Sequence, residues 1–188
     1  MRLIIVSGLS GSGKSVALHA LEDLGYYCID NMPAALLQSV IEEVRAHGED
    51  KKDVLAVGVD ARNRRQDLKS LPDFLDDVKG TDIHAELMFL QADDDILLKR
   101  YSETRRRHPL AEDGSALRAA ISEEREVLSE IINAADLIID TSRLSVYELA
   151  DTIRERVDRR ETSELSVLIE SVGFKNGIPA EAAFVVGL

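Results

Sequence analysis

Apolar runs alternate with segments of helical spacing over most of the chain. The runs fall at residues 2–7, 26–29, 54–59, 87–90 and 137–139, and each is short enough to be a strand. The run at 54–59 is apolar at nearly every position, as expected for a strand that is covered on both faces. Five strands that alternate with helices predict an α/β fold with a five-stranded parallel sheet.

Helices are expected between and after these strands, because apolar side chains recur there every three or four residues. The expected ranges are 16–24, 33–44, 72–79, 93–107, 115–132 and 145–157. Ser115 is the expected cap of the fifth helix, and Ser145 and Glu148 form a capping-box pattern at the start of the sixth. An apolar stripe follows in that helix, made of Val146, Leu149, Ile153 and Val157.

Composition narrows the class of protein. The chain has 188 residues, of which 45% are hydrophobic and 31% charged, as in soluble globular proteins. No apolar run has the length of a membrane span, and Met1 leads directly into the first strand without the pattern of a signal peptide. One cysteine, Cys28, excludes an internal disulfide, so we expect a cytoplasmic protein. The net charge of −12 argues against a general attraction to nucleic acid or to an anionic membrane.

The segment GLSGSGKS at residues 8–15 joins the first strand to the first helix and matches G-x-x-x-x-G-K-S, the phosphate-binding loop. Its glycines allow backbone N–H groups to turn toward a phosphate chain, and the next helix adds the positive end of its dipole. Lys14 would reach the β- and γ-phosphates, and the Ser15 hydroxyl would bind Mg²⁺. An incidental glycine-rich turn is the alternative, but it requires no Lys-Ser pair. The expected nucleotide contacts are Gly8, Leu9, Ser10, Gly11, Ser12, Gly13, Lys14 and Ser15.

Four aspartates end predicted strands: Asp30, Asp60, Asp93 and Asp140. Asp60 follows the most regular apolar run, so it is the favoured Mg²⁺ partner, and Asp30 comes second, as a base or a substrate contact. Caps and turns explain Asp93 and Asp140. Arg62 lies near Asp60, where it would pair either with a phosphate or with an aspartate.

Residues 99–107 are rich in basic side chains, and three arginines are adjacent at 105–107. Part of this charge complements the end of a helix dipole. Adjacent arginines project to different faces, however, so Arg100, Arg105 and Arg106 are candidates for contacts with a transferred phosphate. The four histidines have no metal-ligand spacing, so we interpret them as structural or surface residues and expect no zinc.

Several longer motifs resemble the RapZ/YvcJ family of bacterial nucleotide-binding proteins. They are IVSGLSGSGKSVALHALEDLGYYCIDNMP at 5–33, DARN at 60–63, RYSETRRRHPL at 100–110, ADLIIDTS at 135–142 and GFKNGIP at 173–179. The resemblance covers about residues 1–180. It implies a P-loop domain similar to small nucleoside and nucleotide kinases. We therefore expect a P-loop nucleotide-binding domain at residues 1–160.

The resemblance also implies ATP binding at residues 8–15, and a second motif, assigned to GTP, at Asp60, Ala61, Arg62 and Asn63. Weak ATPase and GTPase activity follows, with Lys14, Asp60 and Arg62 as the catalytic residues and Ser15 and Asp60 as the metal partners. Some members are adaptors that present a small regulatory RNA to an endoribonuclease and so control amino-sugar synthesis. That role belongs largely to a carboxyl-terminal domain.

The tail at 161–188 differs from the rest. It is expected to be a linker and two short strands, at 163–172 and from 184, which are either an edge addition to the sheet or the start of a truncated carboxyl-terminal domain. Two other functions stay open: a true small-molecule or nucleoside kinase with its acceptor near Asp30, and an RNA-binding adaptor with a structural nucleotide site. Base preference and a homo-oligomeric state also stay open.

Overall fold

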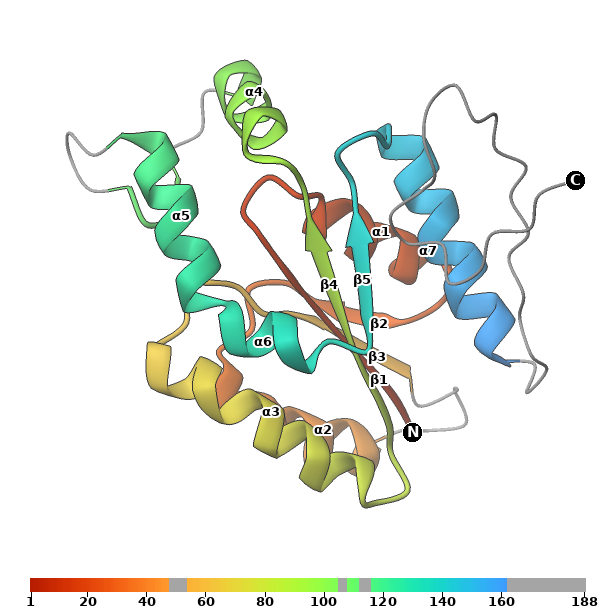
Figure 1. Cartoon of the computed structure of the whole chain (residues 1–188). Helices are drawn as coiled ribbons and strands as arrows, with labels where there is room; N and C mark the ends of the chain where they lie inside the picture. The colour runs from red at the N-terminus through yellow and green to blue at the C-terminus, as the bar shows by residue number, and fades with distance from the viewer. Residues whose placement is uncertain (48–53, 105–107, 112–115, 162–188) are drawn as a thin grey trace, which may run out of the picture.

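A single sheet of five parallel strands forms the centre of the protein, in the order β2–β3–β1–β4–β5 (Figure 1). This computed structural model describes residues 1–47, 54–104, 108–111 and 116–161. The strands are β1 (Arg2–Gly8), β2 (Tyr27–Ile29), β3 (Val54–Gly58), β4 (His84–Gln91) and β5 (Leu137–Asp140). The predicted α/β fold with five parallel strands is therefore confirmed.

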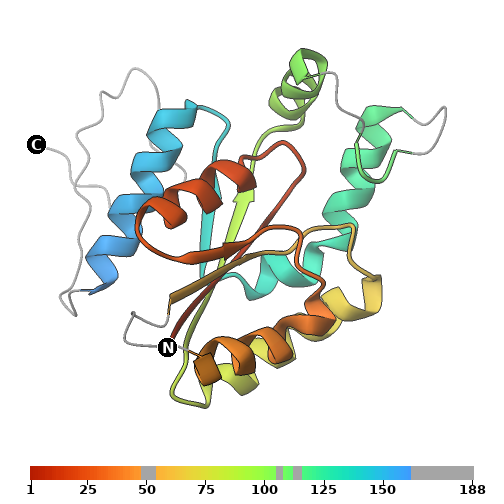
Figure 2. The same ribbon diagram turned by 180° about the vertical axis from the view of Figure 1, so that it is seen from behind.

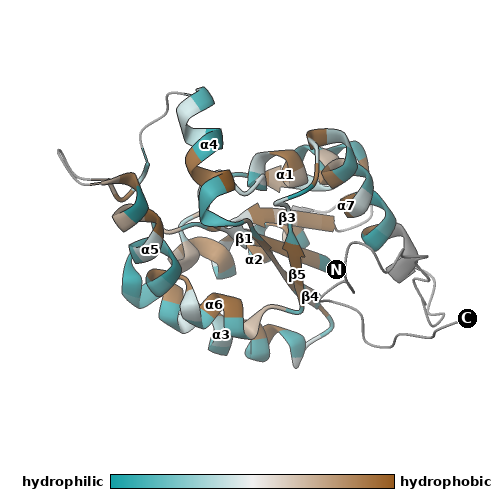
Figure 3. Cartoon of the chain, turned by 45° about the horizontal axis from the view of Figure 1, so that its top comes forward, coloured by the Kyte–Doolittle hydropathy of each residue, from teal (hydrophilic) through white to brown (hydrophobic). Residues whose placement is uncertain are grey.

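Helices cover both faces of the sheet, so the central strands are apolar on both sides (Figures 1 and 2). They are α1 (Lys14–Asp23), the 3₁₀ turn η1 (Ala34–Leu36), α2 (Leu37–His47), α3 (Arg65–Lys79), α4 (Asp94–Thr104), α5 (Leu117–Val127), α6 (Ser129–Ala134) and α7 (Val146–Glu161). Helices α1 and α7 share one core with Ile4 and Val6, while Leu3 and Ile5 face the core shared with α2, α3, α5 and α6. Figure 3 shows the apolar strands between helices that carry both hydrophobic and hydrophilic residues.

Strand β1 lies in the middle of the sheet and pairs with β3 on one side and β4 on the other; Ile5 is in register with Val57 and Leu87. The loop that follows β1 therefore emerges at the centre of the edge formed by the carboxyl ends of the strands. In open parallel sheets this edge is where ligands bind.

Two helices differ from their predicted ranges. Helix α3 begins at Arg65 and not at Pro72, which lies inside it. Pro72 lacks the N–H that would bond the carbonyl of Leu68. The helix continues through it because Leu68, Leu71, Leu75 and Val78 form one buried stripe. The long helix predicted at 115–132 is two helices, α5 and α6, which meet at Leu128; the predicted cap, Ser115, lies outside the described residues.

The other differences from the prediction lie in the edge strand β2 and at the start of α7. Tyr27, predicted in a buried strand, is 62% exposed because β2 is an edge strand, and Val146 is equally exposed although it was expected on the apolar stripe of α7. The capping box is confirmed: Ser145 N–H donates to Glu148 Oε2 (2.8 Å), and Glu148 N–H to Ser145 Oγ (3.2 Å).

The predicted tail strands, at 163–172 and from 184, lie outside the described residues. None of the helices in the described part of the chain combines the length and the apolar character that crossing a bilayer requires.

Candidate functional site

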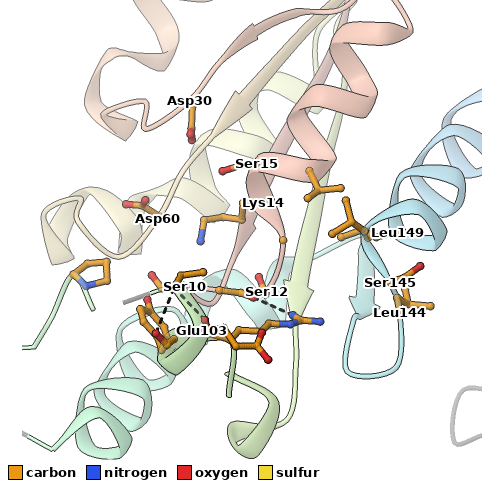
Figure 4. Close-up of a pocket in the computed structure, with 18 of the residues that line it drawn as sticks. Ser10, Ser12, Lys14, Ser15, Asp30, Asp60, Glu103, Leu144, Ser145 and Leu149 are labelled. Carbon is orange, nitrogen blue, oxygen red and sulfur yellow. Dashed lines mark hydrogen bonds between the residues drawn. The ribbon is translucent and has the colours of Figure 1, made fainter. Parts of the chain in front are cut away.

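One cavity of about 670 Å³ opens at the carboxyl edge of the sheet, around the loop after β1 (Figure 4). Its floor is the loop and the first residues of α1, from Ser10 to Val16. One wall carries the charged side chains Asp30, Asp60 and Arg62. The remaining lining comes from α4 and the residues after it, and from the start of α7: Arg100, Tyr101, Glu103, Thr104, Pro109, Leu144, Ser145, Val146 and Leu149.

The loop has the backbone shape expected of a phosphate-binding loop. Gly8, Gly11 and Gly13 all have positive φ angles, of 148°, 89° and 108°. Position 8 also has no room for a side chain, because a Cβ there would lie 2.3 Å from the carbonyl oxygen of Leu90. Ser12 N–H turns back to the carbonyl of Leu9 (3.0 Å), and α1 begins directly after Gly13. The positive end of the α1 dipole therefore points into the cavity.

Lys14 lies folded against this loop. Its Nζ donates to the carbonyls of Gly8 (2.7 Å) and Leu9 (3.2 Å). Burial lowers the pKa of Lys14, while the carboxylates of Glu124, Asp60 and Asp30 offset part of that effect. Figure 4 shows Lys14 at the same end of the cavity as Ser15, Asp30 and Asp60.

Asp60 is almost fully buried and is held by Arg62. The Nε of Arg62 lies 2.9 Å from Oδ2 of Asp60, Nη2 donates to the same oxygen, and the Arg62 backbone N–H donates to Oδ1 (3.0 Å). Burial by itself would raise the pKa of Asp60, but the hydrogen bonds from Arg62 outweigh it and the pKa lies below its ordinary value. Of the two interpretations of Arg62, the structure shows the ion pair, with a guanidinium half-exposed in the cavity wall.

Asp30 is exposed on the same wall, at the end of β2. Its Oδ1 accepts a hydrogen bond from Asn31 N–H (2.7 Å), and Asn31 has a positive φ of 54°. A Cβ on Gly58 would lie 2.7 Å from this Oδ1, so a larger residue there would displace the carboxylate. Asp30 thus lines the same cavity as Asp60, and Figure 4 shows both at the end of the cavity that holds Lys14.

Four of the predicted nucleotide contacts do not line the cavity: Gly8, Leu9, Ala61 and Asn63. Leu9 and Ala61 are buried in the core. Asn63 joins two loops, because its Oδ1 accepts from Ala34 N–H (2.7 Å) and its Nδ2 donates to the carbonyls of Met32 and Asp60 (3.2 Å each). These residues shape the walls of the cavity.

Arg100 was predicted to contact a phosphate, but its guanidinium is engaged by the protein. It donates to the carbonyl of Gly11 (2.9 Å) and to the hydroxyl and carbonyl of Thr141 (3.0 and 2.7 Å). Thr141 in turn donates to the carbonyl of Ser12 (2.9 Å). Arg100 therefore clamps the loop to the segment after β5. Arg105 and Arg106 lie outside the described residues.

Asp93 and Asp140 do not line the cavity. Asp93 N–H donates to the hydroxyl of Ser142 (2.8 Å), and Asp140 Oδ1 accepts from Ser142 N–H (2.8 Å). Asp140 therefore forms a local turn, as its sequence context indicated.

Sequence reasoning missed Glu124 and Thr141, which both hold the loop. Glu124 on α5 accepts hydrogen bonds from Ser10 N–H (2.8 Å) and Ser10 Oγ (2.6 Å). Its neighbours at 123–126 are charged and indicated a solvated face. The available signal was its spacing, since Glu124 lies four residues from both Ala120 and Leu128, which are buried.

The residues present fit a nucleotide's phosphates and Mg²⁺. Ser12 lines the cavity, and its buried hydroxyl has no hydrogen-bond partner among the described residues. Oxygen donors of the kind that Mg²⁺ prefers lie at one end of the cavity, on Ser15, Asp30 and Asp60. In the described part of the chain, no three His, Cys, Asp or Glu side chains form a metal site by themselves.

Comparisons with solved structures show the fold. The YorR protein of Bacillus subtilis, solved in complex with phosphorylated GDP, has a TM-score of 0.53 and 19% identity, covering 85% of this chain and 97% of that one. Shikimate kinase from Acinetobacter baumannii, in complex with shikimate, has a TM-score of 0.52 and 16% identity, covering 85% and 94%. At these identities the likeness establishes a P-loop, kinase-like fold.

Sequence comparisons show the family. A nucleotide-binding protein of Halorhodospira halophila is 51% identical over 185 residues, covering 98% of this chain and 64% of its own length. One from Hahella chejuensis is 46% identical over 185 residues, covering 98% and 65%. The chain thus spans just under two thirds of the length of these curated relatives. The family model described as RapZ-like N-terminal domain matches residues 1–161, and the chain belongs to that family.

Proposed function

We propose that this domain binds ATP or GTP together with Mg²⁺ and hydrolyses it slowly. The observation that carries this proposal is the difference between the two parts of the cavity. One part is polar and charged, with Lys14, Ser15 and Asp60, while the other carries the apolar side chains of Leu144 and Val146. A nucleoside triphosphate has the matching division between a charged tail and a flat base. Relatives that share half of the sequence are named as nucleotide-binding proteins, which supports the same conclusion.

Each side chain at the charged end has a role in this proposal. Lys14 exchanges its bonds to the Gly8 and Leu9 carbonyls for phosphate oxygens, and the Ser12 hydroxyl gains the partner that it lacks. Ser15 and Asp60 hold Mg²⁺, which neutralises charge on the phosphates when bound. Asp60 must first separate from Arg62, whose guanidinium is then able to reach the γ-phosphate. This required exchange of partners agrees with slow turnover.

Titration calorimetry with ATP and GTP in the presence of Mg²⁺ tests the site. Lys14→Ala should weaken triphosphate binding at least tenfold, about 1.4 kcal/mol, because the cation over the phosphates is lost. Lys79→Ala is the matched control, since Lys79 only forms an ion pair with Asp136. Equal affinity in Lys14→Ala and wild type would contradict the assignment.

We propose a regulatory role for this domain in a longer cytoplasmic protein, an RNase adapter that controls small-RNA decay and amino-sugar synthesis. The support is family membership and the length of the relatives, of which this chain spans about 65%. RNA and endoribonuclease contacts are assigned to the remaining third, because a domain with a net charge of −12 attracts RNA poorly. Filter binding of structured RNA at physiological salt should detect no tight complex with this chain; a tight, salt-sensitive complex would place RNA binding here instead.

A small-molecule kinase is the second candidate, and Asp30 favours it. Its carboxylate is exposed in the cavity wall, where it accepts a hydrogen bond from the N–H of Asn31. Such a carboxylate would accept the proton of an acceptor hydroxyl. ADP production that rises strongly with one member of a panel of hydroxylated and nucleoside acceptors, and is lost in Asp30→Asn, would establish this activity. Turnover that stays slow across the panel would exclude it.

A further inference from the structure

Glu124 is a carboxylate in the interior of the protein that the proposed nucleotide chemistry does not use. Its exposed fraction is 0%, and it lies on α5 between the buried residues Ile121 and Leu128. A buried charge is costly unless donors surround it. Here both carboxylate oxygens are occupied. Oε1 accepts from Ser10 Oγ (2.6 Å), and Oε2 accepts from Ser10 N–H (2.8 Å) and from His108 Nε2 (3.2 Å).

His108 is the second holder of this carboxylate and is itself fully enclosed. Its Nδ1 accepts a hydrogen bond from Leu110 N–H (3.2 Å), so the ring proton lies on Nε2 and is donated to Glu124. The ring also contacts Tyr101, with centroids 5.3 Å apart. These contacts fix the direction in which His108 donates.

Three donors around the carboxylate favour its ionised form. Burial alone would raise the pKa of Glu124, but hydrogen bonds from His108 and Ser10 outweigh it, so the pKa lies below its ordinary value. A negative charge behind a phosphate site opposes phosphate binding through space. We therefore look for a role of Glu124 that offsets this repulsion. Its hydrogen bonds point to that role, because their partner Ser10 belongs to the phosphate loop.

We propose that Glu124 is a positioning residue for the phosphate loop, and that the buried chain Ser10–Glu124–His108 holds the loop in its binding shape before a nucleotide arrives. The backbone N–H of Ser10 is turned to Glu124 and away from the phosphates. The loop can then close its turn from Leu9 to Ser12 and present the Ser12 hydroxyl and the start of α1 to the cavity. Preorganisation of this kind raises affinity, because no binding energy is lost in ordering the loop when the nucleotide arrives.

Glu124→Gln is the central test, with two measurements. In the variant an amide oxygen would replace Oε2 and an amide nitrogen would face the Ser10 hydroxyl in place of Oε1. The negative charge is lost, so the charge-assisted hydrogen bonds that hold Ser10 become weaker. We expect faster amide hydrogen exchange of residues 8–15 in the protein without nucleotide, and at least a tenfold loss of Mg²⁺–ATP affinity by calorimetry. Glu123→Gln is the matched control on the same helix, since Glu123 forms only an exposed ion pair with Arg65. It should change neither measurement.

Variants of His108 separate positioning from general loss of structure. His108→Gln places an amide N–H near the former Nε2 and should keep most of the affinity. His108→Phe keeps a ring against Tyr101 but removes the donor, and it should weaken binding and speed exchange of the loop. If only global unfolding accelerates, with exchange of 8–15 raised no more than that of β1 and β4, the role is structural and the proposal is overturned.

The affinity measurement rests on the proposed function, whereas the exchange measurement does not. Wild-type protein that binds no triphosphate would refute the proposed function, and loop exchange would still decide the role of Glu124. Wild-type protein that binds, together with a Glu124→Gln variant that binds equally well and exchanges equally slowly, would refute the positioning role alone. Ser10→Ala, which loses the 2.6 Å hydroxyl bond to Glu124 but keeps the backbone bond, should fall between wild type and Glu124→Gln in both measurements.

Discussion

Asp60 and Arg62 hold each other through both side chains and one backbone amide, so a carboxylate proposed to bind a metal is already neutralised by its own chain. Its metal-binding oxygens become available only when the guanidinium leaves. The pair is thus a structural contact that would have to open for the proposed metal binding.

Arg62→Ala should lower the free energy of unfolding by about 1 kcal/mol near neutral pH, a small value because the guanidinium is half-exposed. Arg62 holds the pKa of Asp60 below its ordinary value although burial raises it, so this stabilisation is present above the unfolded-state pKa of about 3.9 and is lost as the pH falls through the folded-state pKa. Urea unfolding at neutral and acidic pH measures the difference. Arg118→Ala, which breaks an exposed pair with Asp95, is the control. A loss that does not shrink in acid would contradict the linkage.

Gly8→Ala should be far more destabilising than Gly25→Ala, although both glycines have positive φ angles. At Gly25 a Cβ meets nothing within 4 Å, so only the backbone strain of about 1–2 kcal/mol is expected. At Gly8 the Cβ meets the Leu90 carbonyl at 2.3 Å, and backbone in the middle of the sheet cannot move aside. A loss above about 4 kcal/mol, or no folded protein, is expected from urea unfolding. Equal losses of unfolding free energy at the two positions would show that β4 moves enough to accommodate the new Cβ.

Arg100→Lys should reduce the free energy of unfolding by about 1–2 kcal/mol, because an ammonium group cannot bond the Gly11 and Thr141 oxygens together as the guanidinium does. Lys99→Ala, on the exposed side of the same helix, should change it by less than about 0.5 kcal/mol. Thermal or urea unfolding without nucleotide measures both. An unchanged stability combined with lost hydrolysis would favour the phosphate contact predicted from the sequence.

Triphosphate affinity should fall as the pH rises through the Lys14 pKa, which burial places below the ordinary value of about 10.4. Only the protonated amine attracts the phosphates. Calorimetry between neutral pH and about pH 10 would show the decline. In Lys14→Arg the cation does not titrate in this range, so its affinity, whatever its size, should stay level. A decline of equal steepness in both proteins would assign the titration to another group.

Local signals were sufficient to predict the sheet, the loop and the capping box at Ser145. Each depends on residues close together in the sequence, such as the alternation of apolar runs or the spacing of Ser145 and Glu148. Pro72 misled the prediction of α3, because a rule about isolated helices was applied to a helix that packing supports. The exposure of Tyr27 depended on strand order, which places β2 at the edge and which no local pattern contains.

Within the site, the sequence located the side chains that face the cavity better than those that hold it. Lys14, Ser15, Asp60 and Arg62, which the sequence assigned to nucleotide and metal contacts, line one cavity. Arg100 was assigned by its charge, yet its partners are carbonyls and a hydroxyl brought near by the fold. Glu124 and Thr141 are common residue types at unremarkable positions, and their roles arise only once distant segments meet at the loop.

The phosphate loop lies far ahead in the sequence of the residues that hold it. Its contacts with Arg100, Glu124 and Thr141 join residues 89, 114 and 129 positions apart. On a ribosome the glycine-rich segment would emerge early and wait without a fixed form until β5 had been synthesised. The domain would then bind a nucleotide only after its translation is complete. A fragment that ends before Thr141 would contain the whole phosphate-loop sequence but would not bind a nucleotide.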